Sequence, residues 1–254
     1  MIYPRFLYST LLRGITPTFS GTTVSGMPPA NCTDFFDWTF FRADSGNLDF
    51  EMTEDTDIDC VGIYVAEASG SNSIELQYES SPSVFTSLKT FSTPEGSMEL
   101  EKFTPVTVLN GRKIRFVITA ATVLDIRQLM VGEAMDAEQG AWASASPPTF
   151  NSGVKFTNTM SQNGALLGRS IKREDRKGKI MLEYLSDSWV RSTWEEFSTY
   201  FSRYPFFYQW DPNGHPLDVA FAYAEAVNPP KHSQHGFLTV DIPIKMLVAD
   251  SEML

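Results

Sequence analysis

The chain has 254 residues and a formal net charge of -11 at pH 7, with 31 Asp and Glu against 20 Lys and Arg. Its hydrophobic content of 42% and aromatic content of 13% can fill a real core, which excludes a globally disordered chain. The acidic excess argues against a surface for duplex nucleic acid, because phosphate contacts need positive potential. We therefore expect one large or two ordinary domains and no specific nucleic-acid partner.

Alternation of apolar and polar residues dominates the first half of the chain. The clearest alternating stretches and short apolar runs are residues 48–52, 59–66, 74–78, 114–118 and 126–132. Successive side chains of a strand point to opposite faces, so this period of two predicts many short strands. Short strands separated by turn-rich segments are typical of a β-sandwich or barrel. We predict no helix before residue 140.

The pattern changes at residues 140–150, GAWASASPPTF. This segment is small, nearly uncharged and contains proline, as expected of a connection between two domains. Beyond it, apolar residues at helical spacing predict one helix over residues 186–205. Ser186 or Asp187 can cap the N-terminus of this helix, and Pro205 ends it.

Strands flank the predicted helix. Alternation predicts strands over residues 179–185 and 238–248, and FFYQW and DVAFAYA predict two more around the turn DPNGHP. The chain is therefore expected to be mainly β, with a β-sandwich over residues 1–137 and a smaller α+β domain over residues 138–254. In the second domain one main helix packs on an antiparallel sheet.

Six of the 20 Lys and Arg residues lie between Arg169 and Lys179. The preceding string NGALLGRS is not a phosphate-binding loop, because Asn163 replaces its first Gly, Arg169 replaces its Lys, and no helix is predicted after it. Nor does the stretch interleave aromatic residues that could stack on bases. A solvated strand or hairpin is the usual explanation of such a charge run.

A contact between subunits is the other explanation of this basic stretch. A basic projection on an acidic protein can meet an acidic surface on a neighbouring copy, which supplies register and specificity. In this hypothesis, the basic residues of one subunit contact either the region from Asp49 to Asp59 of an adjacent subunit or another partner protein. The basic residues are Arg169, Lys172, Arg173, Arg176 and Lys177.

Metal and catalytic motifs are weak in this sequence. His232 and His235 are three residues apart, but no Cys or carboxylate pattern completes a zinc site, which favours an exposed loop. The acidic cluster from Asp49 to Asp59 could bind Ca²⁺, but it lacks the Asp-x-Asp-x-Asp-Gly loop, which favours solvated strand edges. No hydrolase, metalloprotease or dinucleotide motif occurs. We expect no catalytic site, no metal and no cofactor.

The cysteines and the hydropathy pattern indicate the cellular compartment in which the protein is made. Cys32 and Cys60 are too few for a disulfide scaffold and are more typical of buried small hydrophobic residues than of a redox pair. The N-terminus lacks the apolar run of a signal peptide, and no run approaches the roughly 20 apolar residues of a membrane span. We expect a protein made soluble in a reducing cytoplasm, with no membrane insertion.

Five aromatic residues crowd one seven-residue span: Phe35, Phe36, Trp38, Phe40 and Phe41. Such a cluster fills the core of a sandwich more often than it forms a platform that stacks on sugar rings. Both interpretations stay open here. If the platform exists, Trp38 and Phe41 are its candidate glycan contacts.

The order of these segments resembles that of tail proteins encoded by tailed bacteriophages and prophages. LYSTLLRG, TTVSGMPPANCTDFFDWTFFRA, DIDCVGIYVAEASGSNSIELQYESS and GRKIRFVITAATVLDIRQLMVGEAM resemble a discoidin-like, galactose-binding-type jelly roll. NGALLGRSIKRE, WVRSTWEEF and YPFFYQWDPNGHPLDVAFAY resemble a layout that recurs in the second half of these tail proteins. The resemblance covers nearly the whole chain. Its motifs reflect the residue types that strands and turns require, not the residues of a catalytic site.

This resemblance implies a structural component of the tail tip or baseplate, similar to distal tail proteins. It implies a homo-oligomeric ring, for example a hexamer, that connects the tail tube to the hub or fibres in the virion and needs no cofactor. The subunit contacts named above would then face another copy or another tail protein. Two alternatives remain: a stand-alone carbohydrate-binding module that recognises host surface glycans, and a glycan-degrading enzyme.

Overall fold

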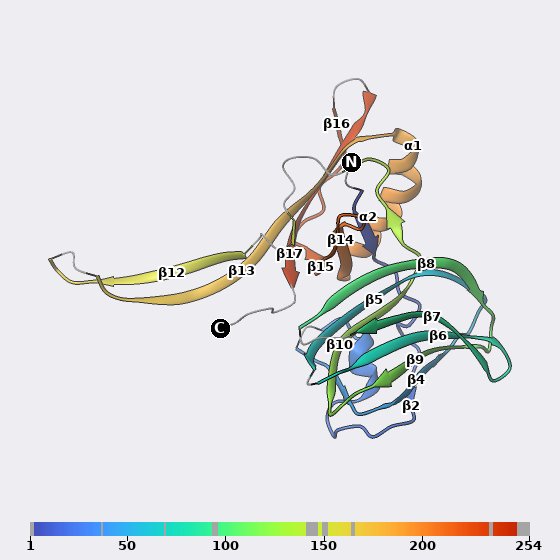
Figure 1. Cartoon of the computed structure of the whole chain (residues 1–254). Helices are drawn as coiled ribbons and strands as arrows, with labels where there is room; N and C mark the ends of the chain where they lie inside the picture. Colours follow the sequence, from blue (N-terminus) through green and yellow to red (C-terminus); the bar gives the residue numbers. More distant parts are fainter. Residues whose placement is uncertain are drawn as a thin grey trace.

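A computed structural model describes residues 3–36, 38–68, 70–92, 96–140, 147–148, 152–163, 166–233 and 236–247 (Figure 1). It contains a β-sandwich, a second sheet covered by one helix, and a long two-stranded extension. The predicted mainly-β fold is confirmed. None of the helices in the described part has the length and hydropathy needed to cross a membrane.

The sandwich consists of two antiparallel sheets that pack face to face. One sheet has the order β3-β10-β5-β8, formed by Phe41–Ala43, Leu124–Gly132, Thr56–Ala68 and Met98–Val108. The other has the order β2-β4-β9-β6-β7, formed by Thr18–Phe19, Gly46–Glu51, Lys113–Thr119, Ser73–Ser81 and Val84–Ser92. The predicted alternation is confirmed, since Ile114, Phe116 and Ile118 of β9 all point into the core between the sheets.

The second unit is an eight-stranded antiparallel sheet. Its order is β11-β1-β14-β15-β17-β13-β12, with β16 also paired to β17. The strands in this order are Met135–Asp136, Arg5–Leu7, Phe206–Asp211, His215–Ala224, Leu238–Leu247, Leu166–Leu185 and Ser152–Met160, with Lys231–His232 as β16.

One helical segment covers a face of this sheet, as predicted. It runs through α1 (Asp187–Trp189), a π-helical stretch (Val190–Trp194) and α2 (Glu195–Phe201). Ser186 is its N-cap, because the side chain of Ser186 accepts a hydrogen bond from the backbone of Trp189. The helix buries Trp194, Phe197 and Phe201, and the Phe197 ring packs against Phe6 and Phe206 of the sheet.

Two details differ from the sequence predictions. A 3₁₀ helix, Pro29–Thr33, occurs before residue 140, and a single short turn of this kind produces no hydrophobic periodicity. The assignment of the chain start to the sandwich is also wrong. Strand β1 lies between β11 and β14, so residues 5–7 and 135–136 belong to the second sheet and the sandwich lies between them in the sequence. Such long-range pairing leaves no local pattern.

The two units share an apolar layer, which we call the inter-unit layer. The sandwich and the second sheet both contribute to it: Leu7, Cys60, Tyr64, Met98, Leu100, Met130, Phe207, Val219 and Phe221. Successive residues of β14 explain this arrangement, because Phe206 and Tyr208 pack under the helix while Phe207 points to the sandwich. Strand β14 is therefore buried on both faces.

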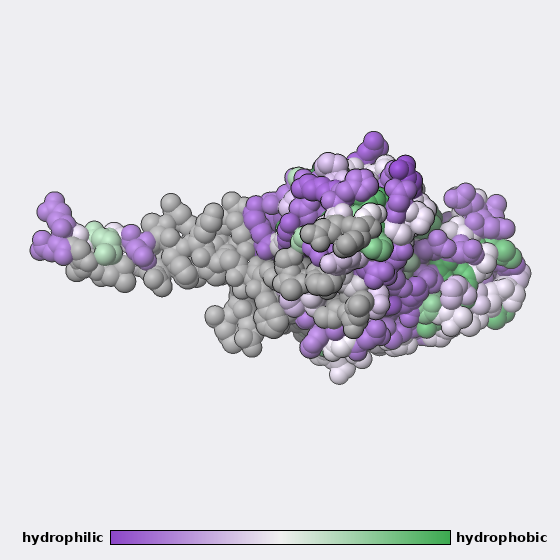
Figure 2. Space-filling view, turned by 90° about the horizontal axis from the view of Figure 1, so that it is seen from above, coloured by the Kyte–Doolittle hydropathy of each residue, from purple (hydrophilic) through white to green (hydrophobic). Residues whose placement is uncertain are grey.

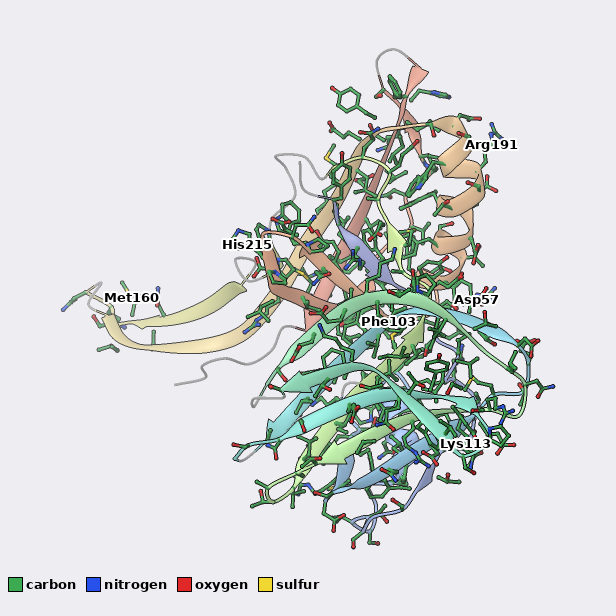
Figure 3. The ribbon with its side chains drawn as sticks, turned by 45° about the vertical axis from the view of Figure 1, so that its right-hand side comes forward. Asp57, Phe103, Lys113, Met160, Arg191 and His215 are labelled. Atoms are coloured by element: carbon green, nitrogen blue, oxygen red, sulfur yellow. The ribbon has the colours of Figure 1, made fainter. Side chains whose placement is uncertain are left out.

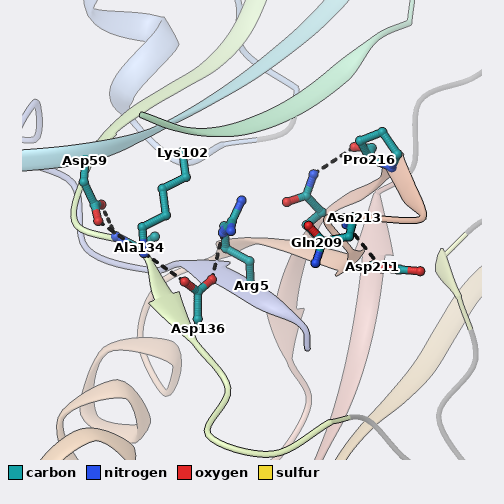
Figure 4. A network of polar contacts seen from close by, with 9 residues as sticks. All are labelled: Arg5, Asp59, Lys102, Ala134, Asp136, Gln209, Asp211, Asn213 and Pro216. Carbon is teal, nitrogen blue, oxygen red and sulfur yellow. Dashed lines mark hydrogen bonds and ion pairs between the residues drawn. The ribbon is translucent and has the colours of Figure 1, made fainter. Parts of the chain in front are cut away.

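A polar network borders the inter-unit layer (Figure 4). The Asp136 carboxylate accepts hydrogen bonds from Arg5 Nε and Lys102 Nζ, each at 2.8 Å. Lys102 also lies 3.4 Å from Asp59, whose carboxylate accepts a hydrogen bond from the Ala134 backbone at 2.7 Å. Burial opposes ionisation of Asp136, but the hydrogen bonds from Lys102 and Arg5 outweigh it and lower the pKa of Asp136.

Gly62 is expected to be essential for the close approach of the two units. A Cβ atom at this position would lie 2.4 Å from Cδ2 of the Phe207 ring, so Gly62→Ala should force the ring or the sheet to shift. We expect a loss of about 1–3 kcal/mol in the free energy of unfolding, measured by urea denaturation. The matched control is Gly168→Ala, because no atom lies within 4 Å of a Cβ there. Equal stabilities of the two variants would contradict this account.

The Asp136 network should make stability depend on pH. Because its folded pKa is lowered, Asp136 stabilises the fold above the unfolded pKa of about 3.9, and this contribution disappears as the pH falls through the folded pKa. Asp136→Asn should therefore cost about 0.5–1 kcal/mol near pH 7, a value limited by partial exposure. The difference should shrink in acid unfolding series. A difference that stays constant with pH would argue against the ion pairs as its origin.

Candidate functional site

The loop between the 3₁₀ helix and β3 is fixed by side-chain hydrogen bonds. The Asp34 carboxylate accepts from the Phe36 backbone at 2.9 Å and from the Thr39 hydroxyl at 2.8 Å. Asn31 Nδ2 donates to the Phe40 carbonyl at 3.1 Å, and Gln128 Nε2 of β10 donates to the Phe36 carbonyl at 3.2 Å. The described residues of this loop, 34–36 and 38–40, are therefore tied to one another and to the sandwich.

This loop exposes a pair of stacked aromatic rings, which we call the aromatic platform. The ring centroids of Phe36 and Trp38 lie 4.7 Å apart with an interplanar angle of 26°. The side chain of Trp38 is 72% exposed and that of Phe36 is 49% exposed. Two flat apolar faces that are already held in place can stack on a ligand without the entropy cost of ordering the loop on binding.

The aromatic cluster divides between core and surface. Trp38 is exposed, so its predicted glycan contact stays a prediction. The prediction for Phe41 is wrong, because Phe41 is fully buried and packs edge-on against Phe19 with centroids 5.0 Å apart. Phe36 is the second exposed ring and was not predicted as a contact. Its spacing of two residues from Trp38 is the sequence signal that points to it.

The basic stretch lies in strand β13, which is continuous from Leu166 to Leu185. The backbones of Arg169, Lys172 and Arg173 lie in its outer half, but their side chains fall outside the described part of the structure. Lys177 does not need a neighbouring subunit for a partner, because its ammonium pairs with Glu225 of the same chain. Its contact with a neighbouring subunit stays a prediction. Arg176 is half-buried.

The acidic region is partly neutralised within the chain. Arg115 forms a bidentate ion pair with Asp49, with contacts of 2.6 and 2.7 Å. Asp59 pairs with Lys102 in the network described above. Within the described ranges, no group of three or more His, Cys, Asp or Glu side chains is placed to hold a metal ion. His235 lies outside the described residues.

Cys32 and Cys60 are both free and buried, as predicted. Cys32 lies in the sandwich core, and Cys60 lies in the inter-unit layer. Burial strongly raises the pKa of both thiols, which keeps them protonated at neutral pH. Neither thiol is therefore suited to act as a nucleophile or a metal ligand.

No family model and no curated protein sequence matches the chain. Among solved structures it is similar to the CBM32-1 module of a family 31 glycoside hydrolase from Clostridium perfringens, with 14% identity over 49% of this chain and 98% of that one, and a TM-score of 0.42. It is also similar to chitosan-binding module 1 of a chitosanase/glucanase from Paenibacillus sp. IK-5, with 19% identity over 48% and 98% of the two chains and a TM-score of 0.40.

A pectin-binding carbohydrate-binding module gives a comparable match. Its identity is 18%, the match covers 48% of this chain and 91% of that one, and the TM-score is 0.40. Each of these three structures corresponds to about half of the chain. The sandwich itself is defined by the two sheets of this chain.

Proposed function

We propose that the sandwich is a glycan-binding module and that the aromatic platform is its contact surface. The observation that carries this proposal is the stacked, exposed pair of Phe36 and Trp38 on a loop fixed by hydrogen bonds. Exposed tryptophan is costly in water and is enriched where proteins bind partners. A flat aromatic face suits the apolar face of a sugar ring.

This function needs neither catalysis nor a cofactor. Among the described residues of the loop, the carboxylate of Asp34 is engaged by the Thr39 hydroxyl and the Phe36 backbone. Aromatic stacking without a reactive group supports binding rather than hydrolysis. We therefore propose a binding protein and not an enzyme.

Loss of the platform should abolish glycan binding without unfolding the protein. Trp38→Ala should weaken binding at least about tenfold, the loss expected at a central aromatic contact. The melting temperature should stay unchanged, because Trp38 lies outside the core. The full-length protein would be tested on a glycan array, and affinities for the glycans found would be measured by calorimetry.

The matched control for this test is Phe237→Ala. Phe237 belongs to another exposed aromatic pair, with Tyr184, on the second sheet unit, and it is 41% exposed. This variant should bind glycan like the unmodified protein. Absence of any bound glycan on the array, or equal binding by the Trp38 and Phe237 variants, would refute the proposed function.

A second proposal concerns the whole chain, as a structural subunit of a bacteriophage tail tip. The observation that favours assembly is the ribbon, which we define as β12 together with residues 166–176 of β13. Figure 1 shows the ribbon extending away from the body, and Figure 3 places Met160 at its far end. Seen from above in Figure 2, hydrophilic residues lie at the ribbon tip.

The ribbon is paired differently from the rest of the sheet. Among the described strands, residues 166–176 pair only with β12, and β13 reaches β17 only from Lys177 onward. An isolated two-stranded ribbon is marginally stable in water, and strand edges in general offer backbone groups that can pair with another chain. Contact with a neighbouring copy or another tail protein would complete it, which supports a ring at the distal end of the tail. A glycan-binding sandwich at a tail tip would also face the cell surface.

Assembly should depend on the exposed apolar side chains of the ribbon. Met160 is 55% exposed and Leu167 is 67% exposed. The double variant Met160→Asp, Leu167→Asp should keep the melting temperature but reduce oligomers in native mass spectrometry and incorporation into purified particles. Leu217→Asp, at a position 77% exposed on β15, is the control. A protein that is monomeric at every concentration and absent from particles would contradict the tail-tip proposal.

A further inference from the structure

Phe35, the residue directly before the platform pair, has an unusual backbone. Its φ is 67°, in the left-handed region that bulky residues seldom adopt. Its ring packs against the inter-unit layer, whereas Phe36 is about half exposed. A residue persists in this conformation only when its surroundings hold it there. The contacts of the Phe35 ring can therefore hold this backbone in place.

Two residues outside the loop hold the Phe35 ring. Tyr204, in the turn after α2, lies against it with ring centroids 5.7 Å apart and an interplanar angle of 34°. The guanidinium carbon of Arg13 lies 3.8 Å from the Tyr204 ring centroid and 5.6 Å from that of Phe35. Arg13 lies between β1 and β2, so this contact joins the platform loop to the helix of the second unit.

We infer that Arg13 and Tyr204 are positioning residues for the aromatic platform. They keep Phe35 turned toward the inter-unit layer, and the left-handed backbone at Phe35 then directs the following residues outward. Without these contacts, Phe35 can return to negative φ, which rotates the chain that carries Phe36 and Trp38. This inference rests on the proposed glycan function, and it makes glycan affinity depend on the helical unit as well as on the sandwich.

The position of Trp38 can be followed without any glycan. The full-length protein would carry 5-fluorotryptophan, and the Trp38 resonance in ¹⁹F NMR spectra would be assigned with Trp38→Phe. Arg13→Ala and Tyr204→Leu should shift or broaden this resonance. Because a partly exposed cation–π contact is modest, the same variants should raise the glycan Kd by roughly two- to five-fold. Neither residue is predicted to touch the glycan.

Conservative and matched variants separate positioning from general destabilisation. Tyr204→Phe keeps the ring and should restore the Trp38 resonance and the affinity. Arg203→Ala removes an exposed cation next to Tyr204 and should change neither the Trp38 resonance nor the glycan affinity. An unchanged Trp38 resonance in both Arg13→Ala and Tyr204→Leu would overturn the inference, as would a fall in melting temperature with no change at Trp38.

The two proposals fail in distinguishable ways. If the unmodified protein binds no glycan, the proposed function fails, while a shifted Trp38 resonance in Arg13→Ala still supports the positioning role. Glycan binding that depends on Trp38, together with a Trp38 resonance and a glycan Kd that are unchanged in Arg13→Ala and Tyr204→Leu, would overturn only the positioning role.

Discussion

The inter-unit layer is the constraint on which the rest of the structure depends. Strand β14 has no solvent-facing side, because Phe206 packs under the helix and Phe207 packs on the sandwich. All five residues from Phe206 to Trp210 are buried, and a strand of this kind requires a cover on both faces. The sandwich and the helix therefore serve as the two covers of one central sheet, and Gly62 provides the space in which the Phe207 ring fits.

Local pattern predicted most of the elements but not how they meet. The alternation at Ile114, Phe116 and Ile118 identified an inward-facing strand, and Ser186 identified the start of the helix. Both signals are short-range, so they can be read from the sequence without knowledge of the tertiary contacts. The pairing of Phe6 with Tyr208 is different, since it depends on contacts between distant parts of the chain. The division of the chain at residue 137 missed it for that reason.

The candidate site shows the same limit at the scale of single side chains. Five aromatic residues in one span look alike in sequence, yet Phe41 is buried, Trp38 is exposed and Phe35 packs on the inter-unit layer. The hydrogen bonds of Asp34 and Gln128 and the backbone conformation at Phe35 set which of these rings is buried and which is exposed. Likewise, Lys177 is neutralised by Glu225, a partner that charge counting along the sequence does not identify.

The position of β1 in its sheet has a consequence for the order of folding. Strand β1 precedes the other described strands in the sequence, but its two neighbours are β11 and β14. Its pairing can be completed only after Asp136 and then Tyr208 have left the ribosome. Pairings between such distant residues form slowly, because the chain loses the entropy of closing a long loop before any contact stabilises the pair. The sandwich strands all lie between these partners and can condense first. Among the described strands, β1 is thus made before the others and is among the last to complete its pairing.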